Sequence, residues 1–243
     1  MLCKGPPQPT QIAGLTGTLF TGMPPFGAAI SFGESLAYQL TAWGCRGSRP
    51  GKDKIKRLAM IDDADLENST LRLLVFQALK QYPTSALVPM LVDKDVIVRS
   101  AVARELQMRG GDDVFVAAKK LGTSERHEAR EIAAFLLGQL GTPTLPYREQ
   151  SIPLLKVHLR DDYYEVRSVA AAALGHLHAD NALDELLALA FDSEPDVREC
   201  VAFALGLIRA NKASIAVLKR LSEEQNKDVR ECAEFALEQH GQH

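Results

Sequence analysis

Apolar residues recur along the chain with the spacing of an α-helix, and the same pattern returns about every 31 residues. The segments DVRECVAFALGLI (196–208) and DVRECAEFALEQH (228–240) are nearly identical and begin 32 residues apart. A leucine stands seven positions after the arginine of each segment. Alignment on this arginine gives six copies, at Arg72, Arg99, Arg130, Arg167, Arg198 and Arg230. Such regular self-similarity predicts a repeat architecture.

Each copy predicts one amphipathic helix. Positions −1, +3, +6 and +7, counted from the arginine, are mostly valine, alanine or leucine, and they share one face at 100° per residue. One copy opens with Ser193-x-x-Asp196, which is similar to a capping box. Three copies carry a glycine after the leucine, where a helix can end or a neighbour can approach closely: Gly138, Gly175 and Gly206.

Shorter apolar segments with helical spacing lie between the copies. They span residues 85–92, 112–121, 151–159, 182–191 and 213–221. The repeating unit is therefore a short helix, a turn and a second helix. Neither helix can bury its apolar face alone, so successive units must stack. The sequence predicts an all-α, right-handed α-solenoid of about five to six helix pairs over residues 53–243.

The second helix of the unit reads V-R-x-x-[AV]-A-x-A-L-G after an acid, best seen at 166–175 and 197–206. Over residues 53–243 this pattern resembles the HEAT-like repeats named after phycobilisome (PBS) lyases, which implies an armadillo/HEAT superhelix. In such repeats an arginine and a nearby acid link neighbouring layers, with Asp196 and Asp228 as acids here. The resemblance gives the structural role to Arg99, Arg130, Arg167, Arg198 and Arg230.

Positions +1, +5 and +9 of the second helix lie opposite the packed stripe, and function is expected where these positions differ between copies. We expect them to line the concave surface and to bind a helix or loop of a protein partner, because aromatic anchors dominate interface energetics. Alternatively, the phenylalanines pack into the core between repeats. An acidic surface would favour a basic partner. The candidate residues are Glu131, Glu199, Glu231, Phe135, Phe203, Phe235, Gln139 and His176.

The sequence predicts no catalytic residue, no metal ligand and no cofactor. His127-Glu128 resembles one of the four His-Glu pairs that hold two irons in deoxyhypusine hydroxylase, a HEAT-repeat enzyme. The matching positions of the other copies lack the histidine, and one pair cannot build an oxygen-activating iron site. The repeat resemblance also leaves open a bilin lyase-like enzyme and a DNA-binding HEAT protein. Residues 53–243 carry more acidic than basic side chains, which disfavours nucleic acid.

Two segments carry a more specific resemblance. Residues 99–121, which contain LQMRGG, and residues 130–140, which contain AFLLGQL, are similar to small enterobacterial HEAT proteins encoded beside Rhs polymorphic-toxin elements. That resemblance implies a bacterial immunity protein, which binds and neutralises a toxin domain. It is the narrower form of a broader prediction, that of a non-catalytic scaffold or adaptor that binds a protein.

Residues 1–52 differ from the repeats, since they hold 9 of the 17 glycines and 6 of the 12 prolines. They predict an irregular or disordered segment, and their apolar runs are too short to span a membrane. The four cysteines (Cys3, Cys45, Cys200 and Cys232) lack C-x-x-C spacing, which fits a reducing cytoplasm. We expect a monomer or weak dimer with neither a membrane nor a nucleic acid as partner.

Overall fold

The computed structural model describes residues 74–241, and all its regular elements in this range are helices. The predicted irregular segment 1–52 lies outside this range, as do residues 53–73. Residues 74–79 are helical. The elements that follow are α4 (Thr84–Leu87), the 3-10 helix η2 (Val88–Val92), α5 (Val96–Arg109), α6 (Asp112–Leu121), α7 (His127–Gln139), α8 (Arg148–His158), α9 (Tyr164–His176), the 3-10 helix η3 (Asp180–Ala182), α10 (Leu183–Leu189), α11 (Pro195–Leu207), α12 (Lys212–Leu221) and α13 (Lys227–Gly241).

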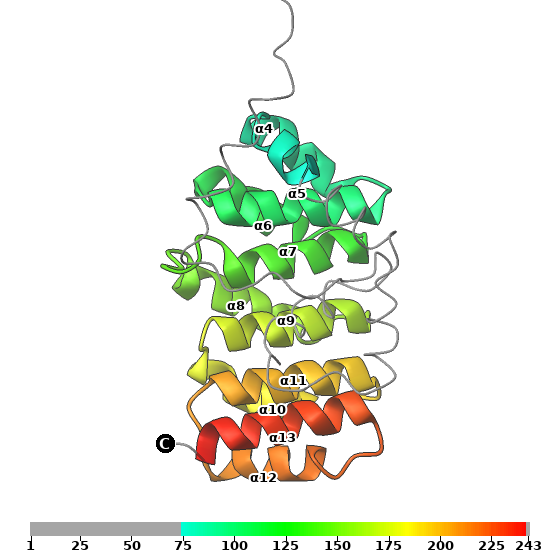
Figure 1. The fold of residues 1–243 in the computed structure, drawn as a ribbon, viewed down its shortest axis with the longest axis vertical. Coiled ribbons are helices and arrows are strands. Elements are labelled where there is room, and N and C mark those ends of the chain that lie inside the picture. Colours follow the sequence, from blue (N-terminus) through cyan, green and yellow to red (C-terminus); the bar gives the residue numbers. More distant parts are fainter. Residues whose placement is uncertain (1–73, 242–243) are drawn as a thin grey trace, which may run out of the picture.

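These elements form helix pairs that stack into an α-solenoid (Figure 1). Each pair joins a first helix to a second helix: α4–η2 with α5, α6 with α7, α8 with α9, η3–α10 with α11, and α12 with α13. The second helices α7, α9, α11 and α13 pack directly on one another along the long axis. The predicted fold class is thus confirmed, and the segment predicted at 112–121 coincides with α6.

The core lies between the two helix layers and between successive pairs. The leucine at position +7 is at most 2% exposed in the second helices α5, α7, α9 and α11. The equivalent Leu237, in the last pair, is partly buried. Burial of a leucine side chain contributes about 1.5–3 kcal/mol. The same stripe, repeated in every layer, therefore supplies much of the stability.

The glycine at position +8 lies inside the helix and marks a close approach between second helices. A Cβ atom added at Gly138 would lie 2.4 Å from Cβ of Ala173. One added at Gly175 would lie 2.7 Å from Cα of Ala204, and one at Gly206 would lie 2.9 Å from Cβ of Ala236. The sequence left open whether these glycines end a helix or let a neighbouring helix approach closely. The structure shows that they allow the close approach.

The repeat arginines connect consecutive turns of the stack. Nη1 of Arg130, Arg167 and Arg198 donates to two carbonyl oxygens in the turn before its own helix, at 2.7–3.1 Å. The other edge of each guanidinium meets a carboxylate in the turn before the next second helix. These pairs are Arg130–Asp161 (2.6 and 2.8 Å), Arg167–Asp192 (2.8 and 3.0 Å) and Arg198–Glu224 (2.9–3.1 Å). Arg99 and Arg230 make the first kind of contact, to the carbonyls of Asp93 and Glu224 at 2.8 Å.

The acids of this ladder are not the ones that the resemblance indicated. They stand six positions before the arginine of the next repeat, whereas Asp196 and Asp228 stand two positions before theirs. Burial acts to raise the pKa of Asp192. The hydrogen bonds from Arg167 and from the backbone N–H of Glu194 outweigh burial, so that the pKa lies below its ordinary value. Asp161 and Asp192 each accept a backbone N–H of their own turn and bind the arginine of the neighbouring layer.

Candidate partner-binding face

The candidate site is the side of the second-helix layer that carries the half-buried polar residues of α7, α9, α11 and α13. We call it the second-helix face. At position +1, Glu131, Glu199 and Glu231 are half-buried. At position +9, Gln139 and His176 are half-buried, and Gln239 is exposed. Because the four helices lie side by side, these positions form rows that run along the stack (Figure 1).

Two of the three predicted phenylalanines do not belong to this face. Phe135 is 3% exposed and Phe203 is 4% exposed, and both are part of the core. The equivalent position between them in the stack is Ala172, which is fully buried. Of the two possibilities for these side chains, packing between repeats therefore applies, and their prediction as exposed anchors is wrong. Phe235 is half-buried.

Carboxylates line the amino-terminal end of the second-helix face. Positions −2 and +1 of the four helices are three residues apart and therefore neighbours on the helix surface. Seven of these eight positions are acidic, the exception being Ser168. We call them the acidic row: Glu128, Glu131, Glu165, Asp196, Glu199, Asp228 and Glu231.

Glu128 and Glu231 of the acidic row each have a basic neighbour, one just before its helix and one on its own helix. Glu128 lies 3.6 Å from Nε of Arg126, and Glu231 lies 3.6 Å from Nζ of Lys227. Oε2 of Glu165 is buried without a hydrogen-bond partner among the described residues. Backbone hydrogen bonding is the main cause that lowers the pKa of Glu128, so this carboxylate stays ionised.

His176 stands near the opposite end of the second-helix face. Its ring meets the ring of Phe203 edge-on, with centroids 5.1 Å apart. Burial, with a smaller contribution from the charge of His178, lowers the pKa of His176 to about 4. Its Nε2 is buried and has no hydrogen-bond partner within residues 74–241. At neutral pH the ring is therefore uncharged, and it packs as a polar aromatic.

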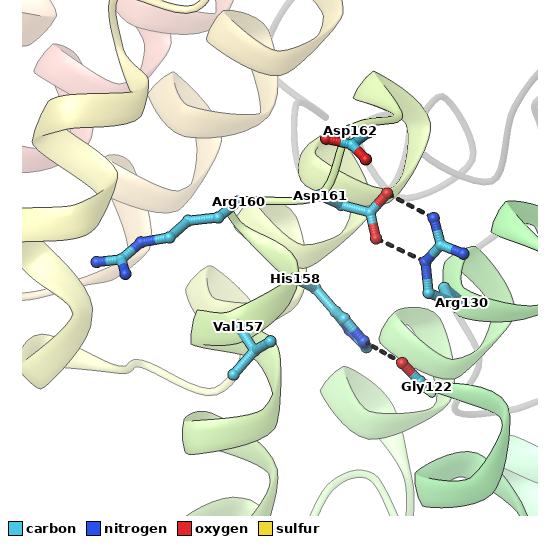
Figure 2. Close-up of a pocket in the computed structure, with 7 residues that line it drawn as sticks. All are labelled: Gly122, Arg130, Val157, His158, Arg160, Asp161 and Asp162. Carbon is cyan, nitrogen blue, oxygen red and sulfur yellow. Dashed lines mark hydrogen bonds and ion pairs between the residues drawn. The ribbon is translucent and has the colours of Figure 1, made fainter. Parts of the chain in front are cut away.

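A pocket of about 390 Å³ lies away from these rows, at the carboxyl-terminal ends of α6 and α8 (Figure 2). Three of its lining side chains make contacts between layers. Arg130 and Asp161 form the bidentate pair of the ladder, and Nε2 of His158 donates to the carbonyl of Gly122 at 2.9 Å. The lining residues are Gly122, Arg130, Val157, His158, Arg160, Asp161 and Asp162.

The pair His127-Glu128, which the sequence analysis considered as a metal site, lies at the start of α7. The His127 ring stacks on Tyr163, with centroids 4.1 Å apart, and Glu128 lies 3.8 Å from its Nδ1. Across the described part of the chain, no three His, Cys, Asp or Glu side chains gather closely enough to hold a metal ion. Cys200 and Cys232 are buried and form no disulfide.

Sequence reasoning did not single out Tyr163 or Phe191. Tyr163 stacks on His127, and its neighbour Arg130 lies 5.7 Å from its ring centroid. Phe191 is 66% exposed and is covered on one face by Arg220 at 4.1 Å. Both aromatic residues precede a second helix, at different distances from its arginine, so a search for equivalent repeat positions could not find them.

The comparisons with known proteins agree with this geometry. Residues 152–238 match the family model for HEAT repeats. The repeats within residues 152–238 are therefore identified as HEAT repeats. Protein YibA from Escherichia coli strains K12 and O157:H7 is 28% identical to this chain over 158 residues, which cover 63% of the chain and 56% of YibA. The chain therefore spans little more than half the length of these curated relatives.

The fold of this chain is also similar to those of solved structures. The X-ray structure of E. coli YibA matches with a TM-score of 0.62 and 27% identity, covering 68% of this chain and 62% of that chain. A designed armadillo repeat protein matches with a TM-score of 0.49 and 20% identity, covering 83% of this chain and 98% of that one. Within residues 74–241, no helix combines the length and the apolar character that crossing a membrane requires.

Proposed function

We propose that this chain is a non-catalytic scaffold that binds a protein partner on the second-helix face. The observation that carries the proposal is the alignment of acidic and amide side chains in rows across α7, α9, α11 and α13. A solenoid presents such rows to one extended ligand, because each layer repeats the same surface position. Half-buried Leu207 and Phe235 add apolar contact area beside the charges.

Three features support a binding role over a catalytic one. In the pocket at α6 and α8, Arg130, Asp161 and His158 are used in contacts between layers, and His127 is stacked against an aromatic ring. His176, with its lowered pKa, packs edge-on against Phe203, and its buried Nε2 has no hydrogen-bond partner in the described residues. General acid–base catalysis needs a titratable group within hydrogen-bond reach of a reacting atom, and Nε2 of His158, the histidine that lines the pocket, already donates to the carbonyl of Gly122.

The finer proposal is that the partner is a toxin domain which the chain neutralises in a bacterial cytoplasm. It rests on the resemblance of residues 99–121 and 130–140 to the small HEAT proteins encoded beside Rhs toxin elements. In the structure these segments contain most of α5, all of α6 and most of α7. They contribute Glu131 and Gln139 to the second-helix face, so a toxin bound there would contact the resembling region directly.

Affinity capture from a lysate of the source organism, with mass spectrometry, tests the proposal. The wild-type chain is compared with a row variant, in which Glu131, Glu199 and Glu231 are replaced by glutamine. These three lie beyond the first turn of their helices, so the acids that favour the helix amino termini remain. A control variant changes three exposed acids outside the acidic row: Glu149→Gln, Asp184→Asn and Glu223→Gln.

The proposal predicts a partner that the wild type and the control capture equally and that the row variant loses. All three proteins must show the same helical circular dichroism and the same melting temperature within a few degrees. Equal capture of every partner by the row variant would mean that binding uses another surface. If the captured partner is a toxin domain, the finer proposal predicts that only the wild type and the control protect cells that express it.

A further inference from the structure

The arginine ladder has a gap between α5 and α7. Nη1 of Arg99 donates to the carbonyls of Asp93 and Lys94 at 2.8 and 3.1 Å, as in the other repeats. In each arginine–carboxylate pair of the ladder, the other edge of the guanidinium binds an acid that stands six positions before the next repeat arginine. For Arg99 that position is Ser124. Nε and Nη2 of Arg99 accordingly make no hydrogen bond or ion pair within residues 74–241.

Ser124 takes the place of the ladder acid in its turn. Its Oγ accepts the backbone N–H of Arg126 at 3.3 Å, and Oδ1 of Asp161 and of Asp192 accepts the equivalent N–H at 3.0 Å. The carbonyl of Ser124 accepts Nη1 of Arg130 at 2.8 Å, which is again the contact that the two aspartates make. Ser124 therefore holds its turn as a ladder acid does, but it brings no charge to the preceding arginine.

The boundary between α5 and α7 also lacks the close glycine contact. The helices α7, α9 and α11 carry a glycine at position +8, where the next second helix approaches. In α5 this position is Gln107, whose side chain is buried. Among the boundaries between consecutive second helices in residues 74–241, only this one has neither a glycine contact nor a ladder carboxylate. An added ion pair would therefore join two layers that have fewer specific contacts than the others.

We propose that Ser124 is a phosphorylation site and that its phosphate completes the ladder by binding Nε and Nη2 of Arg99. A phosphoserine carries about −1.5 to −2 charges at neutral pH, and arginine binds such a group through two parallel hydrogen bonds. The phosphate oxygens stand as many bonds from Cα as the carboxylate oxygens of glutamate. A glutamate already fills this role in the ladder, where Glu224 binds Arg198. The inference is independent of the proposed partner-binding function.

The side chains around the turn are compatible with an added anion. Nη1 of Arg126 donates to the carbonyl of Val92 at 3.0 Å, so a second guanidinium bridges the same two turns as Arg99 and Ser124. The acid beside it, Glu128, lies 3.6 Å from Nε of Arg126. Within the described residues Glu128 forms no ion pair with Arg99, so the free edge of Arg99 is available to the phosphate.

The turn is accessible to the enzyme that this modification needs. Ser124 is half-buried, and Thr123 and Glu125 on either side of it are exposed. A protein kinase would transfer the γ-phosphoryl group of a nucleoside triphosphate to Oγ of Ser124. The bond from Oγ to the γ-phosphorus forms, and the bond from this phosphorus to the bridging oxygen of the β-phosphate breaks. Nucleoside diphosphate leaves, and the hydroxyl proton passes to a base of the kinase.

Amide hydrogen exchange of the full chain tests whether a phosphate at residue 124 joins the two layers. We compare the chain that carries phosphoserine at position 124 with the unmodified chain. A control chain carries phosphoserine in place of Thr123, which adds the same charge one residue away. All three are also made with Arg99→Gln, and mass spectrometry measures the exchange of the amides of α5.

The inference predicts that phosphoserine at position 124 slows exchange in α5 about tenfold, the effect of one charge-assisted hydrogen bond. The control chain should exchange as the unmodified chain does, and Arg99→Gln should remove the difference. Equal exchange with and without the phosphate, or a slowing that persists in Arg99→Gln, would overturn the inference. If Arg99→Gln unfolds α5, Arg99→Lys replaces it and should lose most of the slowing, because lysine lacks the planar fork.

Mass spectrometry of the chain purified from its source organism tests the modification itself. Trypsin releases residues 121–126 (LGTSER), and fragment masses distinguish Thr123 from Ser124. The inference predicts a phosphate on Ser124 in growing, starved or heat-stressed cells, and its loss after treatment with a phosphatase. Absence of this phosphate under all three conditions, or a phosphate on Thr123 alone, would overturn the inference.

Discussion

Gly206 and Gly175 hold equivalent places in consecutive second helices, and the structure predicts that they respond differently to a compensating change. A Cβ atom added at Gly206 would lie 2.9 Å from Cβ and 3.2 Å from Cα of Ala236. A Cβ atom added at Gly175 would lie 2.7 Å from Cα and 3.1 Å from Cβ of Ala204. The closest obstacle is a side-chain atom in the first case and a backbone atom in the second.

Two effects set the magnitude for each single change. Alanine is favoured over glycine inside a helix by about 1 kcal/mol. Overpacking a close interface costs about 1–3 kcal/mol. We therefore expect Gly206→Ala and Gly175→Ala each to lose about 0–2 kcal/mol of the free energy of unfolding. In the double variant Gly206→Ala with Ala236→Gly the helix propensities cancel, because one Cβ atom is moved from one helix to the other.

The double variant at 206 and 236 should therefore approach wild-type stability, with a coupling free energy of about 1–3 kcal/mol. Ala204→Gly should rescue Gly175→Ala much less, because the Cα atom of residue 204 remains. Urea unfolding followed by circular dichroism measures both cycles. Equal coupling in the two pairs, or no coupling at 206 and 236, would show that the helices do not approach each other at these atoms.

Three further predictions concern stability. Asp192→Asn should lower the free energy of unfolding by about 1.5–3 kcal/mol, because the side chains of Arg167 and Asp192 are only 15% and 8% exposed. Glu149→Gln, at a residue whose side chain is 78% exposed, should change this free energy by less than about 0.5 kcal/mol. Similar losses for the two variants in urea unfolding would contradict the ladder. Leu174→Ala should cost about 2–5 kcal/mol, since Leu174 is fully buried, and a loss below about 1 kcal/mol would place this leucine outside the core. The folded-state pKa of His176 is lowered to about 4, so its neutral form stabilises the fold fully above the unfolded pKa of about 6.5, and stability falls as the pH drops from there towards 4. Between pH 7 and pH 4.5 the wild type should lose up to about 1.4 kcal/mol of stability per pH unit, and the urea midpoint of His176→Gln should depend less on pH than that of the wild type. Parallel plots of midpoint against pH for the two proteins would mean that the ring is not held neutral.

The sequence predicted the helices well because each repeat solves the same packing problem. The spacing of apolar residues defines a helix from its own residues alone, which is why α6 was predicted at its observed limits. Side-chain burial at position +5 could not be predicted in the same way. It depends on the neighbouring helix, where the small Ala172 stands between Phe135 and Phe203. A single helical period does not contain that information.

The ladder acids were detectable in the sequence. An acid stands six positions before Arg99, Arg167, Arg198 and Arg230, so this spacing recurs in four of the six copies. The resemblance directed attention to acids inside the helix instead. An arginine at the start of a helix reaches the turn of the next layer more easily than along its own axis, so the acids of the turns were the better candidates.

The most direct test of the proposed function is a calorimetric titration of the captured partner into the wild type, the row variant and the control variant. The account predicts that the dissociation constant of the row variant is at least about tenfold higher than the wild-type value, or about 1.4 kcal/mol, and that the control variant matches the wild type. It also predicts that added salt weakens wild-type binding more than row-variant binding. Equal dissociation constants for the wild type and the row variant would contradict binding on the second-helix face.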